Sequence, residues 1–291
     1  MAPPSGLGWA ASHAALPILH PDDRGAQSLY FTSRDANNRA HIGRAALSLD
    51  GVPAAVALEP EPILGPGPQG AFDDSGVTGS CLVRAGDALH LYYTGWTLAG
   101  LAPFRLEIGC AVSADGGRSF RRVLDSPVAA VNDVDPVLTA SPSILVEGGV
   151  WRIWYVSGTG WSKAEKPEPS YHIRYAESAD GLHWKRDGRV CLDYHNPAEH
   201  AFGRPHVVRE RGIYRMWFCV RGAAYRLGYA ESADGFEWER LDHLSALPPS
   251  RSGWDSEMIA YPHLADVGEE RWLLYNGNGY GRTGIGYAVG G

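Results

Sequence analysis

A short motif with the pattern Ile-Gly-x-Ala-x-Ser-x-Asp-Gly recurs along this chain and constrains its fold more than any other feature. Its copies begin at Ile42, Ile108, Ile173 and Leu227, and a truncated copy begins at Ile285. Successive copies start 66, 65, 54 and 58 residues apart. A supersecondary unit repeated at this period is typical of solenoids and propellers, in which each unit packs against its neighbours.

Each repeat contains three strand patterns followed by a turn. An aliphatic run, often with a proline, precedes an aromatic run such as HLYYTGW from His90. The recurring motif supplies the third strand. Its Asp-Gly pair predicts a tight turn, because the Asp side chain bonds nearby amides and Gly tolerates positive φ. An aromatic residue such as Trp184 or Trp238 then begins a fourth strand. With no sustained helical periodicity, this pattern predicts an all-β fold.

Five such units in 291 residues predict a five-bladed β-propeller with four-stranded antiparallel blades around a central channel. We expect one domain spanning residues 1–291. The last unit ends after its third strand, and the segment before His13 is a candidate for the missing strand, although its Pro and Gly content argues against that role. The first strand of each blade lines the channel of a propeller, so ligand-binding residues are expected in the segments that lead into those strands.

Composition argues against several classes of partner. The net charge of −7 disfavours nucleic acid and anionic membrane surfaces. We find neither a signal peptide nor an apolar run of the roughly 20 residues that a membrane span requires, so we expect a cytoplasmic protein. The four cysteines lack metal-type spacing and are expected to be buried, reduced thiols. Nothing in the sequence indicates an oligomeric state.

The chain resembles the five-bladed propeller glycosidases of families 43, 32, 68, 117 and 130. The resemblance covers nearly the whole chain. It rests on the blade count, on the Tyr-Ala-Glu-Ser-x-Asp-Gly turns, and on Ser-Pro-Ser from Ser141, Arg-Pro-His from Arg204 and Tyr-Pro-His from Tyr261. It implies a small-molecule, carbohydrate-type ligand at the mouth of the central channel.

The catalytic acids of these families are absent from their usual places. Family 43 implies an Asp on the first blade, an Asp before proline on the third and a Glu before Gly-Pro-His on the fourth. The corresponding positions here are the segment around His13, which has no carboxylate, then Ser141 and Gly203. Glycosidases need two carboxyl groups about 5 to 9.5 Å apart. This chain must therefore build the pair elsewhere or carry out another reaction.

Carboxylates in the channel segments are the remaining catalytic candidates. Asp74 and Glu257 belong to blades separated by one other blade and are expected to face each other. Glu257 would then donate a proton and Asp74 would activate water. We also predict Asp255 as catalytic and Asp73 as substrate-binding. Either Asp could instead cap a turn through backbone amides.

His206 and His263 occupy matching positions in neighbouring repeats, so their imidazoles are expected to approach each other. Three interpretations stay open. In the first, the pair acts on the ligand, with His206 catalytic and His263 substrate-binding. In the second it holds a metal ion, and in the third it is a structural pair bonded to loop carbonyls. We predict no cofactor and no metal, with a metal at this pair as the alternative.

Arginines near the predicted mouth favour an anionic ligand, because the guanidinium fork matches carboxylate or phosphate geometry. Each could instead pair with a local carboxylate. The remaining predicted substrate-binding residues are Arg34, Ser141, Arg204, Arg221, Asn276 and Asn278, and Arg282 lies in a similar place.

The sequence therefore predicts a carbohydrate-active propeller, an enzyme that acts on a glycosidic or sugar-like, anionic substrate in polysaccharide or glycosylated-metabolite biosynthesis. One alternative is a non-catalytic sugar-binding module that lost its acids. Another is a propeller recruited to a lyase, cyclase or transferase reaction. Substitutions in the pocket distinguish them, since an enzyme loses turnover while keeping its ligand and a binding module loses only binding.

Overall fold

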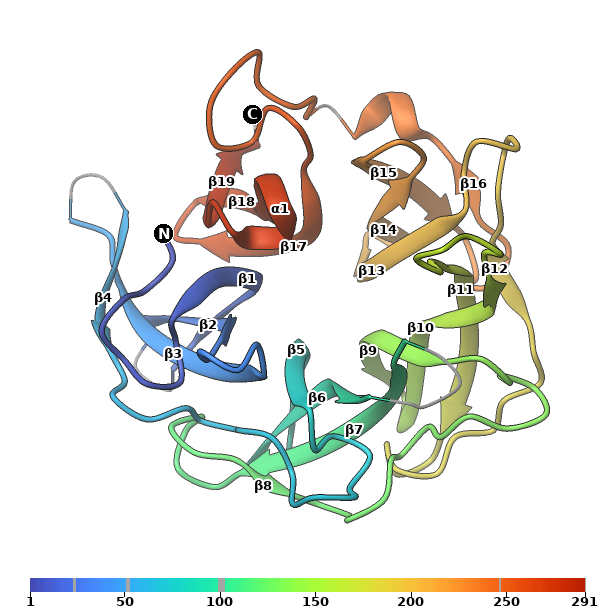
Figure 1. Ribbon diagram of the computed structural model, residues 1–291. Helices are drawn as coiled ribbons and strands as arrows, with labels where there is room; N and C mark the ends of the chain where they lie inside the picture. Colours follow the sequence, from blue (N-terminus) through green and yellow to red (C-terminus); the bar gives the residue numbers. More distant parts are fainter. Residues whose placement is uncertain (23–24, 51–52, 99–102, 246, 291) are drawn as a thin grey trace.

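The computed structural model describes residues 1–22, 25–50, 53–98, 103–245 and 247–290. Antiparallel pairing divides its strands into successive groups (Figure 1). The first group contains β1 (Ser12–Pro21), β2 (Gln27–Arg34), β3 (Ala40–Ser48) and β4 (Ala54–Leu58). The second contains β5 (Gly76–Ala85), β6 (Ala88–Thr97), β7 (Arg105–Ser113) and β8 (Arg121–Arg122).

The later groups repeat this order. The third contains β9 (Thr139–Glu147), β10 (Val150–Trp161), β11 (Pro169–Ser178) and β12 (Val190–Leu192). The fourth contains β13 (Ala201–Glu210), β14 (Ile213–Arg221), β15 (Tyr225–Ser232) and β16 (Glu239–Arg240). The last contains β17 (Ala260–Val267), β18 (Glu270–Asn276) and β19 (Ile285–Val289). Two single turns of helix complete the chain, η1 (Asp242–Leu244) and α1 (Asn278–Gly281).

Single parallel bridges join some of these groups at their edges. Ala40 pairs with Gly76 and Tyr171 pairs with Ala201, which produces two eight-stranded sheets beside a three-stranded one. Within the described residues none of these sheets closes on itself by hydrogen bonds. No helix in the described part of the chain has the length and apolar character needed to cross a membrane.

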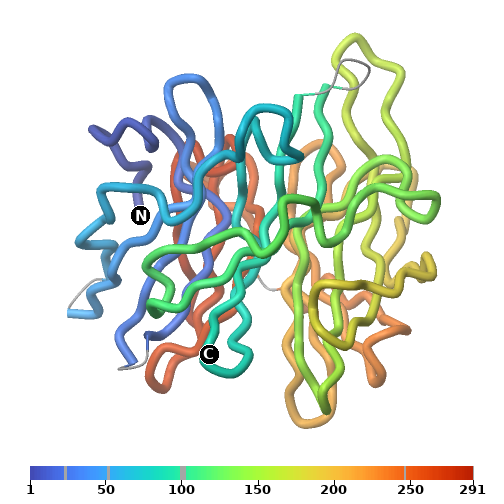
Figure 2. The backbone as a smooth tube through the Cα atoms, turned by 90° about the horizontal axis from the view of Figure 1, so that it is seen from below, coloured from blue at the N-terminus to red at the C-terminus, as the bar shows by residue number. Residues whose placement is uncertain are grey.

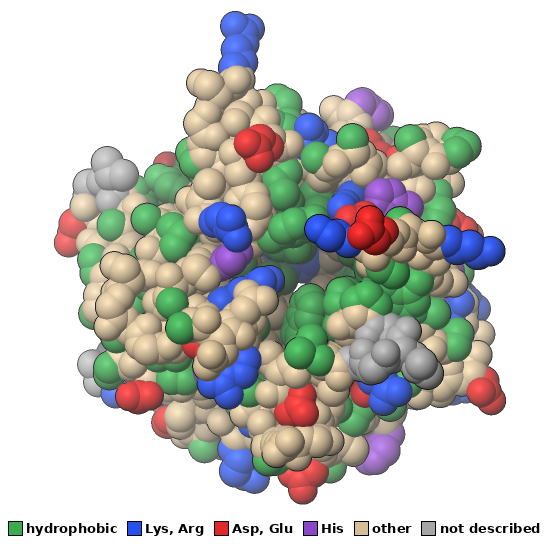
Figure 3. Space-filling model, viewed as in Figure 1, with side chains coloured by type: hydrophobic (Ala, Val, Ile, Leu, Met, Phe, Trp, Pro, Cys, Tyr) green, Lys and Arg blue, Asp and Glu red, His purple; other side chains and the backbone are tan. Residues whose placement is uncertain are grey.

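The first strand of each group faces a common axis. β1 contacts β5, β5 contacts β9, β9 contacts β13, β13 contacts β17, and β17 contacts β1. These contacts surround the central hollow visible in Figures 1 and 3. Figure 2, turned by 90°, shows the strands running along the axis with loops at both ends, and the β10–β11 hairpin projecting at one of them. The prediction of an all-β propeller is confirmed.

The recurring motif forms the turn that the sequence predicts. In the third group the amides of Leu182 and His183 donate to the Asp180 carboxylate at 2.8 and 2.9 Å. Gly181 follows with a φ of 76°, and its carbonyl accepts a hydrogen bond from the Tyr92 hydroxyl of the second group at 2.8 Å. Each motif therefore shapes its own turn and also provides a contact for the preceding group. The turn of the first copy lies partly outside the described residues, at Gly51.

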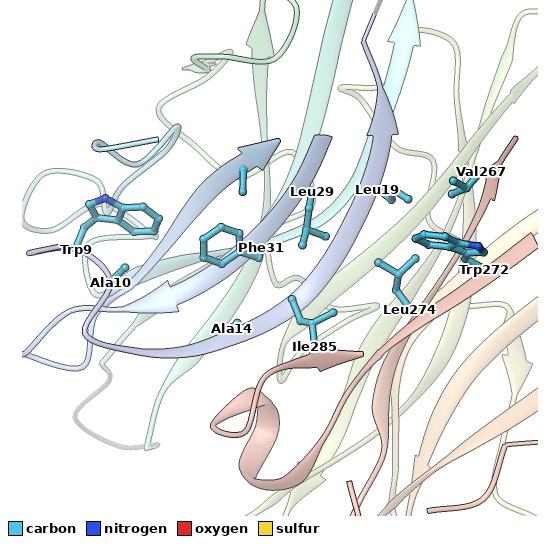
Figure 4. Close-up of a cluster of buried hydrophobic side chains, with 11 residues drawn as sticks. Trp9, Ala10, Ala14, Leu19, Leu29, Phe31, Val267, Trp272, Leu274 and Ile285 are labelled. Carbon is cyan, nitrogen blue, oxygen red and sulfur yellow. The ribbon is translucent and has the colours of Figure 1, made fainter. Parts of the chain in front are cut away.

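Apolar side chains fill the space between groups. Figure 4 shows the cluster between the first and last groups, where Phe31 and Leu29 of β2 lie in one cluster with Trp272 and Leu274 of β18. The N-terminal segment also contacts the last group, because the Ile285 amide donates to the Met1 carbonyl at 2.9 Å. Residues 1–11 form no strand beside β19, so this segment supplies one point of attachment rather than a full outer strand.

Candidate functional site

Bulges in the inner strands shape the wall of the channel. Each inner strand shows a register shift against its partner, and the residue at the shift has a positive φ in four of them. These φ angles are 52° at Leu16, 48° at Ser141, 40° at Arg204 and 59° at Tyr261. Residues with a Cβ rarely adopt this conformation, and bulges of this kind re-aim side chains beside functional sites.

A cavity of about 420 Å³ opens at the end of the channel where these bulges lie. This volume suits a small-molecule ligand. Figure 3 looks into this end of the molecule, where hydrophobic and Lys or Arg side chains surround the hollow. The apolar part of the lining includes Trp96, Phe104, Leu106, Leu138 and Val156. The polar part includes His13, Thr32, Arg34, Thr78, Thr94, Ser141, Lys166, Glu168, Tyr171, Arg221, Tyr225, Tyr261 and Tyr280.

One corner of the cavity is basic. The β1–β2 register places Ser12 opposite Arg34, so that Arg34 and His13 lie at the same end of these strands. Arg282 follows α1, which packs on β1. Burial, together with the charges of Arg34 and Arg282, lowers the pKa of His13 to about 4. The imidazole is therefore neutral at pH 7.

A second corner combines tyrosines with an ion pair. Arg221 Nη2 donates to Glu168 Oε1 at 2.7 Å, and the hydroxyl oxygens of Tyr171 and Tyr225 lie 2.5 Å apart. Tyr280 packs edge-on against Tyr225, with ring centroids 6.1 Å apart. Among the described residues that line the cavity, Glu168 is the sole carboxylate. This part of the lining therefore lacks the carboxyl pair of a glycosidase.

The predicted residues Asp73 and Asp255 lie beneath the surface as parts of the scaffold. Asp73 is fully buried and accepts hydrogen bonds from the Tyr93 hydroxyl at 3.0 Å and from Arg122 Nε at 2.8 Å. Asp255 accepts from the Tyr275 hydroxyl at 3.0 Å. Neither residue lines the cavity. The sequence carries a sign of this role, because in both pairs the Tyr follows the Asp by 20 residues.

Asp74 and Glu257 do not meet across the channel. Asp74 caps a turn, where it accepts the Gly70 amide at 2.9 Å and the Ser75 hydroxyl at 2.8 Å. Glu257 is exposed, and neither carboxylate lines the cavity. The expectation that they face each other is wrong, since both precede the point at which the chain turns inward to form β5 and β17.

His206 and His263 do approach each other, with ring centroids 4.6 Å apart. They lie in the channel and outside the cavity lining. His263 Nε2 lies 3.2 Å from the Leu19 carbonyl, and burial lowers the pKa of His206 to about 3. No group of three or more His, Cys, Asp or Glu side chains in the described residues is placed to hold a metal ion. These contacts match the interpretation of a structural pair.

Arg204 crosses the channel beside these imidazoles. It is 1% exposed, and its Nη2 donates to the carbonyls of Pro17 on β1 and Ser80 on β5, at 2.7 and 3.1 Å. Its backbone neighbour Gly203 lines the cavity, but its own side chain does not. Arg204 therefore ties three inner strands together below the ligand space.

The two predicted asparagines are used by the backbone. Asn276 is fully buried, where it donates to the Ala14 carbonyl at 2.8 Å and accepts the Leu16 amide at 2.8 Å. Asn278 Oδ1 accepts the Glu257 amide at 2.8 Å. Neither lines the cavity, whereas Arg34, Ser141 and Arg221 do, as the sequence predicted.

Sequence reasoning missed most of the tyrosines that line the cavity. Tyr261 directly precedes an inner-strand proline, a position that Ser141 and Arg204 share and that was a usable sign. Tyr171 and Tyr225 lie at the starts of β11 and β15, outside the segments taken as the channel mouth. Tyr280 comes from the Gly-rich segment before β19, where its φ of 60° follows Gly279 at 62°.

Relatives share this sequence along nearly their whole length. No protein-family model matches it. The chain is 43% identical over 288 residues to "Uncharacterized protein Rv1502" of Mycobacterium tuberculosis (strain ATCC 25618 / H37Rv), covering 99% of this chain and 96% of that protein. It is equally similar to "Uncharacterized protein MT1551" of strain CDC 1551 / Oshkosh, with the same coverage. The chain belongs to the Rv1502 family.

Solved structures relate this member of the Rv1502 family to glycoside hydrolase propellers. One glycoside hydrolase superposes with a TM-score of 0.74 at 14% identity, over 99% of this chain and 92% of its own. A thermostable family-43 glycoside hydrolase gives 0.70 at 15% identity, over 98% and 91%. The Bombyx mori GH32 beta-fructofuranosidase BmSUC1 in complex with sucrose gives 0.65 at 16% identity, over 100% and 60%. These similarities establish the fold of the Rv1502 family as that of the glycoside hydrolase propellers.

Proposed function

We propose that this chain is a single five-bladed propeller domain over residues 1–291 that takes a carbohydrate-type ligand in its central cavity. Each antiparallel group then forms one blade, which agrees with the contacts that run from β1 through β5, β9, β13 and β17 back to β1. The last blade has three strands, β17 to β19. The location of the cavity, at the mouth of a channel in a glycoside hydrolase propeller fold, supports a sugar-like ligand.

The observation that carries the proposal is the two-sided lining of the cavity. Trp96 and Phe104, whose ring centroids lie 5.0 Å apart, provide aromatic surface of the kind that packs on the apolar face of a sugar ring. Hydroxyl and imidazole groups from Thr78, Ser141 and His13 line the same space and suit hydroxyl recognition. Arg34 and Arg221 favour a ligand with negative charge.

The chemistry we propose is not hydrolysis by a carboxyl pair. In the described lining Glu168 stands alone and is engaged by Arg221, so the second carboxyl group that this mechanism requires is missing. His13 is neutral and able to accept a proton, so we assign it the acid–base role in an enzyme of another reaction class. The second candidate is a sugar-binding module, which the neutralised Glu168 favours.

Binding and turnover separate these candidates. Isothermal titration with a monosaccharide panel is expected to detect binding that Trp96→Ala weakens at least about tenfold, by loss of stacking surface. Tyr287→Ala, at an exposed tyrosine of β19, is the control. An enzyme should lose turnover and keep its ligand in His13→Gln, whereas a binding module shows no turnover in either form. Equal binding by the wild type and Trp96→Ala would contradict the site.

We also propose a cytoplasmic location and a role in polysaccharide or glycosylated-metabolite biosynthesis. The four cysteines are free thiols, which suits a reducing compartment. Cell fractionation with a tagged copy tests the location, and the glycan profile of a deletion strain tests the role. An unchanged profile would count against it.

A further inference from the structure

The basic corner of the cavity is assembled from opposite ends of the chain. Asn276 bonds the Ala14 carbonyl and the Leu16 amide, and thereby docks the segment after β18 onto β1. Gly281 completes this contact, since a Cβ added to it would lie 2.5 Å from the Ala14 carbonyl oxygen. The chain then continues into Arg282 beside His13. The close packing of Gly281 therefore delivers a second guanidinium to the corner that already holds Arg34.

We propose that Arg34, Arg282 and His13 form a subsite for an oxyanion carried by the ligand, a sugar carboxylate or a sugar phosphate. This inference rests on the proposed function and specifies the class of ligand. The guanidinium groups supply several N–H donors in a planar fork, which matches the oxygens of either anion. The aromatic wall at Trp96 and Phe104 then receives the sugar ring.

The charge balance of the corner supports this assignment. Arg34 bonds only the neutral Asn38 side chain, at 2.9 Å, and no carboxylate in the described residues forms an ion pair with Arg34 or Arg282. Other arginines near the channel are neutralised, as Arg221 is by Glu168 and Arg122 by Asp73. Two like charges at one partly buried corner repel each other, and a bound oxyanion relieves that repulsion.

The electrostatics of the neighbouring groups agree with the geometry. Burial, with the added repulsion of Arg282, lowers the pKa of Arg34. The same two arginines keep His13 neutral, so that it offers a hydrogen bond without adding a third charge. Ser12 Oγ lies 2.9 Å from His13 Nδ1 and orients the ring. No acidic side chain at this corner competes with an incoming anion within the described lining.

Isothermal titration with four probes tests the subsite: glucose, glucuronate, glucose 6-phosphate and inorganic phosphate. We expect at least one of the two acidic sugars to bind about tenfold to 100-fold more tightly than glucose, because hydrogen bonds between charged groups are the strong ones. Arg34→Met and Arg282→Met should each remove most of that advantage and leave glucose affinity unchanged. Arg34→Lys should recover only part of it, since lysine lacks the fork.

Arg118→Met is the control for net charge, because Arg118 is exposed on a turn of the second group far along the chain from the corner. It should leave every affinity unchanged. Wild-type preference for acidic sugars in both Arg34→Met and Arg282→Met would overturn the subsite, as would equal affinity for glucose and the acidic sugars. Inorganic phosphate that binds as tightly as glucose 6-phosphate would overturn the assignment to a sugar-borne group. Failure of every sugar, glucose included, would instead refute the proposed function itself.

Discussion

Tyr280 holds its ring in the cavity at the expense of its backbone. Its φ is 60°, directly after Gly279 at 62°. For a residue with a Cβ, this left-handed conformation costs about 1 to 2 kcal/mol. Replacement by Ala removes the ring and keeps the strain, whereas replacement by Gly removes both. The two variants together separate backbone strain from ligand contact.

We expect Tyr280→Gly to be more stable than Tyr280→Ala by about 1 kcal/mol. Release of the strain contributes about 1 to 2 kcal/mol, and the greater freedom of glycine in the unfolded chain offsets about 0.4 to 1 kcal/mol of it. The ring is 38% exposed, so its removal should cost little stability. Urea unfolding followed by tryptophan fluorescence measures the difference. Titration with the acidic sugar should show equal loss of affinity in both variants, because both lack the ring.

Tyr287 of β19 provides the matched control, since it is 37% exposed and has no positive φ. There the Gly variant should be less stable than the Ala variant by about 0.5 to 1 kcal/mol, the reverse order. Equal stabilities of Tyr280→Gly and Tyr280→Ala would refute the strain argument. Unchanged sugar affinity in both would show that Tyr280 takes no part in binding.

Three other substitutions or conditions have defined outcomes. Asp135 is fully buried against Tyr155 and Arg186, so Asp135→Asn should cost about 3 kcal/mol in urea unfolding, and a loss below about 1 kcal/mol would contradict that role. Glu257→Gln should leave sugar affinity and turnover unchanged, and a hundredfold loss of rate would restore it as a proton donor. Stability should fall as the pH drops from 6.5 toward 4, because folding lowers the pKa of His13 to about 4 and of His206 to about 3, so the unfolded chain binds these protons first. Urea midpoints at pH 7 and pH 5 measure this fall, which His206→Gln should reduce; an unreduced fall would exclude His206 as a source.

The fold was predictable because each repeat carries local instructions. The motif around Asp180 and Gly181 encodes both its own turn and the contact with Tyr92. The position of Ser141, just before a proline of an inner strand, likewise led to the cavity wall. These features depend on residues close together in sequence, which pattern analysis detects.

The carboxylates were less predictable because their direction depends on tertiary packing. Asp73 and a ligand-binding Asp look alike in sequence, and only the contact with Arg122, a residue 49 positions later, identifies the buried role. The tyrosines at 171 and 225 reach the cavity from third strands, whose ends lie at the mouth because of the twist of each group. The positive φ at Arg204 turns a side chain that looked ligand-facing into a tie across the channel.

The bonds of Asn276 with Ala14 and Leu16 connect positions more than 250 residues apart in the chain. During synthesis the first inner strand therefore emerges long before the side chain that completes it. Until residue 276 has left the ribosome, the bulge at Leu16 lacks its partner and the apolar edge of the first group stays uncovered. Contacts of such sequence separation form slowly and leave incomplete chains prone to aggregation. This protein is thus expected to depend on late closure of its ring, and a permuted chain that begins at the last group should shorten the interval in which that edge is exposed.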